Sequence, residues 1–426
     1  MITEKIKRQL EVVDWDFSEH LPGITKSIHW YPGTYPSDLP ATLIQALSKV
    51  DDLVIDPYGG VGTTGLEAVR QARKAWMLEA NPIGCLAAYV AGGMVLLKTI
   101  DPRLVALIFN QIRQKLKQLA GDLDTQPLLD GTASLTFDID NIMNGLISPS
   151  PEKFIKVYTN DSCTDLLSDW FEEDTLRRVL ILNNLDNWNL GSDFVGLIIK
   201  AMTSSILRAC SSQNKSWGHI ADNVKPKQRV QKDVFGTAGR WLTRFETMLR
   251  NTEVDTLSEK QSNGIRLTVS LHNWGDATPP TDIPNQTGVL LVTSPPYAGA
   301  IDYTLAQRLS LYMFGFADST VASMCQKEIG ARRKRFLSTS HVDWANQISA
   351  ALNTQLSYIE HSGHAVFVLP HKDAGRDIGT QAMTDCLIKN RWEKVIEVDR
   401  SIRQVRARQS WTSIKRETIH IFGNYS

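Results

Sequence analysis

The chain has 426 residues, enough for roughly two to three domains, and its 42% hydrophobic and 22% charged residues are ordinary for a globular protein with a sizeable core. Its 46 basic and 46 acidic residues cancel, which excludes a global attraction to polyanions, so any contact with nucleic acid must use local patches. The five cysteines form no CxxC pair, the histidines form no HExxH motif and no apolar run reaches ~18 residues. We therefore expect a reduced, cytoplasmic protein with no metal site and no membrane span, since the charged N-terminus also lacks an apolar signal core.

The first part of the chain predicts alternating strands and helices. In order, the expected elements are a lead-in over 1–28, an aromatic and proline-rich loop over 29–36, a helix over 40–50, a strand over 53–55, a glycine-rich loop, a helix over 64–72, a strand over 75–78 and a buried apolar helix over 84–97. The compact strand–loop–helix–strand unit is typical of a parallel α/β sheet.

Helical patterns dominate the middle of the chain. Residues 104–119 and 194–210 have helical spacing, and we interpret residues 99–264 as an inserted, largely helical subdomain. Strands resume after it, over 265–269, 289–292, 365–369, 394–398 and 417–422. The predicted division is thus 1–98, 99–264 and 265–426, with the sheet built from the first and last parts.

The glycine-rich loop after the first strand matches GxGxxG, with glycines at Gly60, Gly62 and Gly65. Glu79 ends the next strand, where a carboxylate can hold ribose hydroxyls. This pattern fits dinucleotide enzymes and S-adenosylmethionine enzymes alike, and also an ordinary turn. Because Asp56 at the strand tip would repel a pyrophosphate and attract a cationic group, it favours S-adenosylmethionine.

A second motif, Thr293-Ser294-Pro295-Pro296-Tyr297, follows the apolar run over 288–292. The two prolines end the strand and remove two backbone donors, which leaves carbonyl acceptors between a serine hydroxyl and an aromatic ring. Such a group suits binding an exocyclic amino group and stacking on a flat base. No cysteine follows a proline, which argues against carbon-5 methylation through a covalent cysteine.

Both motifs resemble those of amino-methylating DNA methyltransferases. Residues 56–64, DPYGGVGTT, resemble the family's cofactor motif DPFxGSGTT with Tyr58 for Phe and Val61 for Ser, and residues 293–297 resemble its catalytic motif. The resemblance covers about 29–98 and 265–370 and implies an α/β, Rossmann-like methyltransferase fold with a mostly parallel seven-stranded sheet. It also implies S-adenosyl-L-methionine as the cofactor and a base flipped out of double-stranded DNA as the target.

The resemblance assigns roles to individual residues. The Ser294 hydroxyl and the Pro295 carbonyl would bind the target amino group, Tyr297 would stack on the base, and Asp276 would hold the adenine of the cofactor. Residues 29–36 resemble the loop that closes over the methionine end of the cofactor, and Asp302-Tyr303 is a frequent companion of the catalytic motif. The predicted catalytic residues are Ser294, Pro295, Pro296 and Tyr297, and the predicted cofactor residues are His29, Tyr31, Pro32, Asp56, Pro57, Tyr58, Gly60, Gly62, Thr63, Thr64, Glu79 and Asp276.

Local basic clusters are the candidate DNA contacts, although each also fits a solvated charged face. The first contains Lys225, Lys227 and Arg229, shortly after the segment 217–223, and the second contains Arg332, Arg333, Lys334 and Arg335. A third contains Arg400, Arg403, Arg406 and Arg408. We favour the second, because it can reach the face that carries the catalytic motif.

Ser294 at the first motif position favours N4 of cytosine as the target, since Asp or Asn there marks N6 of adenine in this family. The expected role is restriction–modification or a related defence system, with a cognate component of that system as partner. N6-adenine methylation, RNA base methylation and a non-catalytic DNA-binding protein remain alternatives. The 99–264 insertion is the candidate target-recognition subdomain, but it lies before Asp276, so the subclass stays open.

Overall fold

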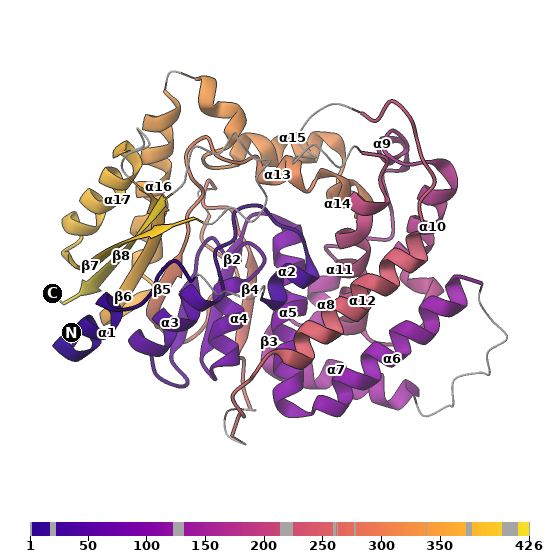
Figure 1. Ribbon diagram of the computed structural model, residues 1–426, viewed down its shortest axis with the longest axis horizontal. Coiled ribbons are helices and arrows are strands. Elements are labelled where there is room, and N and C mark those ends of the chain that lie inside the picture. The colour runs from indigo at the N-terminus through magenta and orange to yellow at the C-terminus, as the bar shows by residue number, and fades with distance from the viewer. Residues whose placement is uncertain are drawn as a thin grey trace.

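In this computed structural model, the structure describes residues 2–17, 23–121, 132–213, 225–258, 261, 263–276, 278–337, 339–371, 377–402 and 416–425. A sheet occupies one half of the molecule and a helical half lies beside it (Figure 1). The described strands are β1 (Leu53–Asp56), β2 (Lys74–Glu79), β3 (Ile147–Ser148), β4 (Leu267–Leu271), β5 (Gly288–Thr293), β6 (Ile359–Pro370), β7 (Trp392–Ser401) and β8 (Arg416–Asn424).

The sheet has the order β3-β4-β2-β1-β5-β6-β8-β7. β8 is antiparallel to both β6 and β7, and the other pairs are parallel. Because the chain proceeds from β1 to β2 on one side and later continues at β5 on the other, the strand order reverses between β1 and β5. In open α/β sheets, ligands bind outside the carboxyl ends of the strands at such a point.

The seven-stranded prediction was wrong by one strand. All seven expected strands are present in a mixed α/β, mostly parallel sheet that is compatible with a Rossmann-like fold, and β3 is the eighth. β3 comes from the predicted helical insertion and pairs with Leu267 and Thr268 of β4. A strand of two residues is too short to show alternation, so only its tertiary pairing reveals it.

Helices cover both faces of the sheet and form the second half of the molecule. They are α1 (Glu4–Glu11), α2 (Ile24–Ile28), α3 (Asp38–Leu47), α4 (Thr63–Arg70), α5 (Pro82–Ile100), α6 (Pro102–Leu119), α7 (Thr132–Leu146), α8 (Pro151–Ile155), α9 (Thr164–Ser168), α10 (Glu173–Asn183), α11 (Asp193–Cys210), α12 (Val234–Asn251), α13 (Tyr303–Ala306), α14 (Arg308–Met313), α15 (Asp318–Lys327), α16 (Ser340–Leu356) and α17 (Asp377–Lys389).

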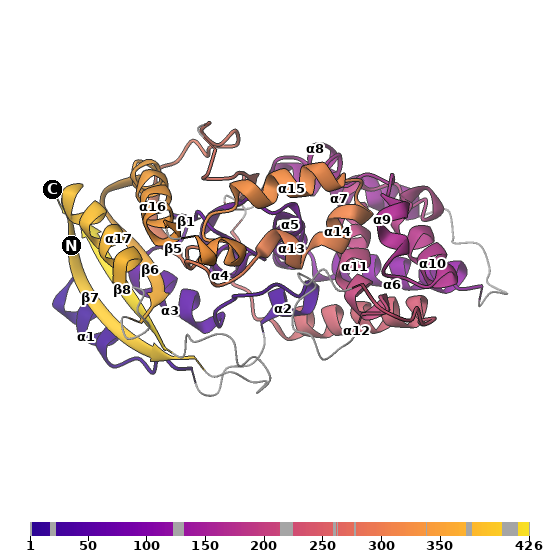
Figure 2. The same cartoon turned by 90° about the horizontal axis from the view of Figure 1, so that it is seen from above.

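Alternate residues of β1 point into different cores. Leu53 and Ile55 join a cluster with Ile348 of α16, whereas Val54 joins the main cluster with Leu66 of α4. Figure 2 shows α16 and α17 on one side of the strands and α1 and α3 on the other. Each fully buried aliphatic side chain contributes about 1.5–3 kcal/mol, so both layers stabilise the edge that carries the site.

The helix α5 lies in the core, as the sequence predicts. It is long and apolar enough to cross a membrane, but 83% of its most apolar window is buried inside the protein. Asn81 caps its N-terminus by accepting a hydrogen bond of 3.0 Å from the amide of Ile83, and Pro82 occupies the first turn. This cap fixes Asn81 at the carboxyl end of β2.

The helical part of the chain shares its core with the sheet. Val90 of α5, Ile198 of α11 and Phe245 of α12 belong to one hydrophobic cluster. The insertion is helical apart from β3 and a short 3-10 turn in the residues described, and the boundaries at 99 and 264 stay a prediction. All five cysteines are free thiols.

Candidate active site

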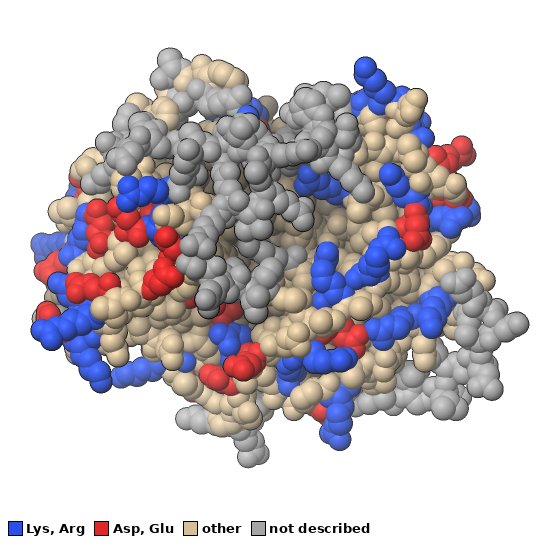
Figure 3. Space-filling view, in the orientation of Figure 1, with Lys and Arg blue, Asp and Glu red and all other residues tan. Residues whose placement is uncertain are grey.

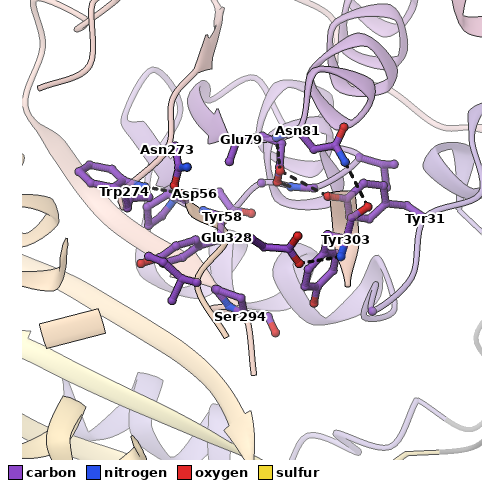
Figure 4. A pocket seen from close by; sticks show the side chains of 18 of the residues that line it. Tyr31, Asp56, Tyr58, Glu79, Asn81, Asn273, Trp274, Ser294, Tyr303 and Glu328 are labelled. Carbon is purple, nitrogen blue, oxygen red and sulfur yellow. Dashed lines mark hydrogen bonds between the residues drawn. The ribbon is translucent and has the colours of Figure 1, made fainter. Parts of the chain in front are cut away.

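A pocket opens at the carboxyl ends of four neighbouring strands. It contains about 970 Å³ of space, including the part open to solvent, which is in the range of small-molecule sites. Asp56 ends β1, Asn81 follows β2, Asn273 and Trp274 follow β4, and Ser294 follows β5. Figure 4 shows these side chains arranged around a single cavity. The pocket therefore lies at the point where the strand order reverses.

The glycine loop supplies one wall with bare backbone. Gly60 and Gly62 have positive φ angles of 54° and 93°, which glycine adopts without strain. A Cβ on Gly62 would lie 2.8 Å from the Ala88 Cβ and 2.9 Å from its Cα, so α5 packs directly on the loop. These two requirements explain why the loop needs glycine here.

Asp56 is buried at the tip of β1, with 3% of its surface exposed. Its Oδ1 accepts hydrogen bonds from the Thr293 hydroxyl at 2.6 Å and from the Tyr58 amide at 3.2 Å. Burial raises the pKa of Asp56 to about 6, although these donors oppose the shift. The bond to Thr293 joins the first motif directly to the residue before Ser294.

Glu79 is held at the end of β2 by backbone donors. Its Oε2 accepts from the Gly60 amide at 2.8 Å, and its Oε1 accepts from the Asn81 amide at 2.8 Å and from the Tyr31 hydroxyl at 3.3 Å. Burial raises the pKa of Glu79 to about 7, and the neighbouring Asp56 adds to the shift. Two carboxylates in one apolar-walled cavity make it attractive to a cation.

The loop over 29–36 contributes part of the pocket wall. Tyr31, Thr34 and Tyr35 line the cavity, and the Tyr35 hydroxyl bonds to the hydroxyl of Thr64. His29 lies behind this wall: its Nε2 is 2.8 Å from the Ser204 hydroxyl of α11, and burial lowers its pKa to about 4. His29 thus ties the loop to the helical half.

The second motif is divided between the pocket and the interior. Ser294 and Pro296 line the cavity, and the Pro296 carbonyl accepts a 2.8 Å hydrogen bond from Trp344 Nε1. Tyr297 is turned inward, and its hydroxyl bonds to Glu417 at 2.9 Å. In this conformation the serine faces the ligand space while the tyrosine hydroxyl is fixed to β8.

The segment after β4 contributes side chains that the sequence reasoning missed. Asn273 and Trp274 line the pocket, and Trp274 Nε1 donates to the Pro57 carbonyl at 2.7 Å. Asp276 lies outside the lining residues and forms a 2.8 Å ion pair with Lys327. β4 ends at Leu271, two residues later than predicted, and Asn273 and Trp274 lie just beyond its carboxyl end.

The wall opposite the glycine loop comes from residues that follow the second motif. Tyr303 stacks on Tyr31 with ring centroids 5.8 Å apart, and Glu328 accepts hydrogen bonds from the Tyr303 and Thr304 amides at 2.7 and 3.2 Å. Arg333 lies 3.6 Å from Glu328 and also donates to Asp302 at 3.0 Å. Tyr303 therefore lines the pocket, whereas Asp302 is not among the lining residues, and Glu328 is a further lining residue without a signal in the sequence.

By position, the predicted site residues line the pocket, lie next to its lining or, in the case of Asp276, pair with Lys327 outside it. Those lining the pocket are Tyr31, Asp56, Pro57, Tyr58, Gly60, Thr63, Glu79, Ser294 and Pro296. Those adjacent to it but outside the lining are His29, Pro32, Gly62, Thr64, Pro295 and Tyr297. Asp276 stays a prediction, as do the roles of the others.

The basic clusters differ in how their side chains are used. Lys227 and Arg229 are exposed, and Lys225 pairs with Asp169 at 2.5 Å. Arg333 is tied to Asp302, and Lys334 donates to the carbonyls of residues 326 and 328. Arg332 is half-buried, and the side chain of Arg335 lies outside the described residues.

Arg400 of the third cluster is buried against Glu417, whereas Arg403, Arg406 and Arg408 lie outside the described residues, as does the segment 217–223. Figure 3 shows Lys and Arg gathered over the helical half of the face drawn, where α12 carries the exposed Arg240, Arg244 and Arg250. Within the described ranges, no group of three or more His, Cys, Asp and Glu is arranged to hold a metal.

Comparisons with known proteins agree with this geometry. Residues 4–89 match a family model described as a DNA methylase of the N6/N4 type. The N-terminal segment is therefore similar to the N6/N4 DNA methylases. This confirms the resemblance to amino-methylating DNA methyltransferases, and the matched segment contains the 29–36 loop, Asp56, the glycine loop and Glu79.

A curated relative of the chain is the type II methyltransferase M.PvuII of Proteus hauseri, which is 44% identical over 52 residues. That alignment covers 12% of this chain and 16% of the relative, so the chain matches less than one fifth of the relative's length. No solved structure gives a significant match to the chain. The second motif at 293–297 lies outside the matched family segment.

Proposed function

We propose that this protein is an S-adenosylmethionine-dependent DNA methyltransferase that modifies the exocyclic amino group of a flipped base, with N4 of cytosine as the favoured target. The observation that carries the proposal is that one pocket is lined by both Asp56 of the first motif and Ser294 of the second. A methyl donor and its acceptor must meet within a few ångströms, and a shared cavity provides that proximity.

The pocket residues fit S-adenosylmethionine. The carboxylate of Asp56 suits a cationic amino or sulfonium group, Glu79 suits ribose hydroxyls, and Trp274 and Asn273 suit a purine ring and its edge. The bare backbone at Gly60, with its positive φ, lets a ligand approach the chain closely. When bound, this cofactor supplies an electrophilic methyl group, and the side chains named here hold it beside the base.

The protein's own contribution to the chemistry is to orient a weak nucleophile. The lone pair of a base amino group is conjugated with the ring, so it reacts poorly until its hydrogens are held by acceptors. The hydroxyl oxygen of Ser294 borders the pocket and can accept one of those hydrogens. Serine rather than Asp or Asn at this position favours cytosine over adenine, as the resemblance implies.

Double-stranded DNA is the proposed substrate, and restriction–modification or a related defence system is the proposed setting. The methylase family of residues 4–89 and the type II methyltransferase relative support this assignment. The exposed side chains of Lys227 and Arg229 are candidates for phosphate contacts on the helical half, whereas the exposed Arg240 and Arg250 of α12 pair with Asp233 and Glu246.

The test is methylation of DNA by the purified chain, followed by digestion and nucleoside analysis. We expect N4-methylcytosine in DNA and no product in RNA of the same sequence. Single-molecule sequencing of DNA from cells that express the chain would give the modified base and its sequence context together.

Two variants make this test sharp. Ser294→Ala should lose methyl transfer by about 10²-fold or more while cofactor binding persists, whereas Ser319→Ala, exposed on α15, should keep wild-type activity. N6-methyladenine as the product would refute the cytosine preference. Cofactor binding with no transfer to DNA in any context, or transfer to RNA alone, would refute the proposal itself.

A further inference from the structure

A chain of hydrogen bonds runs from the pocket into the antiparallel edge of the sheet. The Ser294 hydroxyl donates to the Tyr297 hydroxyl at 3.1 Å, and Tyr297 donates to Glu417 Oε1 at 2.9 Å. Glu417 Oε2 in turn accepts from Arg400 Nη1 at 3.0 Å. The proposed function uses only the first member of this chain, so the other three need an explanation.

The inner end of the chain is a buried ion pair. The side chains of Arg400 and Glu417 are only 4% and 12% exposed, and they lie directly opposite each other on β7 and β8. Glu417 is also opposite Pro370 at the end of β6, which brings it beside the second motif at the end of β5. Burial raises the pKa of the Glu417 carboxyl, and the permanently charged Arg400 guanidinium opposes this shift and favours the carboxylate.

The direction of each hydrogen bond follows from this arrangement. The two other partners of the Tyr297 hydroxyl are the Glu417 carboxylate and the Val368 carbonyl at 3.1 Å, and both can only accept. The single proton of Tyr297 is therefore committed to them. Towards Ser294 the tyrosine oxygen can act only as an acceptor, so Ser294 must donate its own proton inward.

This direction determines what Ser294 presents to the pocket. With its proton turned towards Tyr297, its oxygen offers only lone pairs to a ligand. An amino group can donate to those lone pairs, whereas a ring carbonyl cannot. We propose that Glu417, held by Arg400, is a positioning residue that acts through Tyr297 to fix Ser294 as a hydrogen-bond acceptor and so selects a base with an amino group over one with a carbonyl at the reacting position.

This inference rests on the proposed function, and three variants test it. Tyr297→Phe keeps the ring but removes the hydroxyl. Glu417→Gln reverses the hydrogen bond between residue 417 and Tyr297. Because Arg400 has only donors, it keeps the amide oxygen as its acceptor, and the amide NH2 then faces Tyr297. That NH2 donates to the Tyr297 oxygen and competes there with the Ser294 hydroxyl. Glu393→Gln, on the exposed surface of β7, is the matched control.

The kinetic readout separates positioning from folding. Both Tyr297→Phe and Glu417→Gln should lower kcat about 10-fold, as expected for one misdirected hydrogen bond, with KM for the cofactor unchanged. The double variant should be no worse than Tyr297→Phe alone, because Glu417 acts only through the hydroxyl. Additive losses, or a change in the cofactor KM with kcat unchanged, would overturn the proposal.

The selectivity readout uses DNA in which the target cytosine is replaced by uracil, or a target adenine by hypoxanthine. The wild type should bind the carbonyl-bearing DNA more weakly than the amino-bearing DNA, and both variants should narrow that difference. An unchanged preference in Glu417→Gln would overturn the proposal while leaving the proposed function intact.

A spectroscopic readout needs no activity. In protein labelled with ¹³C at the tyrosine Cζ, the resonance assigned to Tyr297 by its loss in Tyr297→Phe should shift in Glu417→Gln and not in Glu393→Gln. If this resonance does not move, the inference fails whatever the enzyme does. If it moves but wild-type protein methylates nothing, the proposed function fails and the contact stands.

Discussion

Replacing Gly62 by alanine should destabilise the protein for two separate reasons. The φ of 93° at this position is unfavourable for a residue with a Cβ, which costs about 1–2 kcal/mol. The new Cβ would also lie 2.8 Å from the Cβ and 2.9 Å from the Cα of Ala88, where backbone on α5 cannot move aside, and overpacking of this kind costs about 1–3 kcal/mol. The expected loss in unfolding free energy is about 2–5 kcal/mol.

Gly121→Ala is the matched control for this prediction. Gly121 also has a positive φ, 78°, but no atom lies within 4 Å of the Cβ that alanine would add, so only the backbone cost applies. Chemical denaturation of both variants and the wild type measures the difference, which should be about 1–3 kcal/mol. Equal losses would refute the argument that α5 packs on the loop. Binding of S-adenosylmethionine should weaken in Gly62→Ala alone.

Four further predictions concern charged residues. Burial raises the pKa of Asp56 to about 6, so cofactor affinity measured by calorimetry should rise as the pH increases through that value, and Asp56→Asn should flatten the profile. The raised pKa also means that the contribution of Asp56 to stability is present below its unfolded pKa and is lost as the pH rises through about 6. In thermal denaturation, Asp56→Asn should therefore gain stability relative to the wild type as the pH approaches neutrality. Lys227→Ala should reduce the slope of log DNA affinity against log salt by about 1. Arg333→Ala should leave that slope unchanged, because Arg333 is held in an internal ion pair. Equal slopes for the two variants would contradict this reasoning. Arg400→Met should lower the unfolding free energy by about 3 kcal/mol in chemical denaturation, since it leaves Glu417 buried without its charged partner. Adding Glu417→Gln should restore part of that loss. Strictly additive losses in the double variant would argue against the pairing.

Local patterns were sufficient where a feature depends on neighbouring residues. The glycine loop, the buried helix α5 and the strand before Ser294 were all found from short-range spacing. The errors arose at ends and at long-range pairings. The end of β4 was placed two residues early, and the pocket residues Asn273 and Trp274 beyond it were missed.

The charged residues show the same limit. A run of basic side chains such as 332–335 is visible in the sequence, but its partners are not. Arg333 is bound to Asp302, 31 positions away, and Arg400 to Glu417 across a hairpin, so neither is a simple surface charge. Composition can show where charge is concentrated, but only tertiary contacts show whether that charge faces solvent.

The sequence by itself was enough to predict the kind of site. Asp56, the glycine loop and Ser294 are short motifs whose chemistry follows from residue type and spacing, and they sufficed to predict a methyl donor and an amino-group acceptor. The tertiary structure decided how the site is assembled. It joined Asp56 to Thr293 across β1 and β5, closed the pocket with Glu328, and placed Arg400 and Glu417 behind Tyr297. Those contacts link residues far apart in the chain, and only the strand order of the folded sheet brings them together.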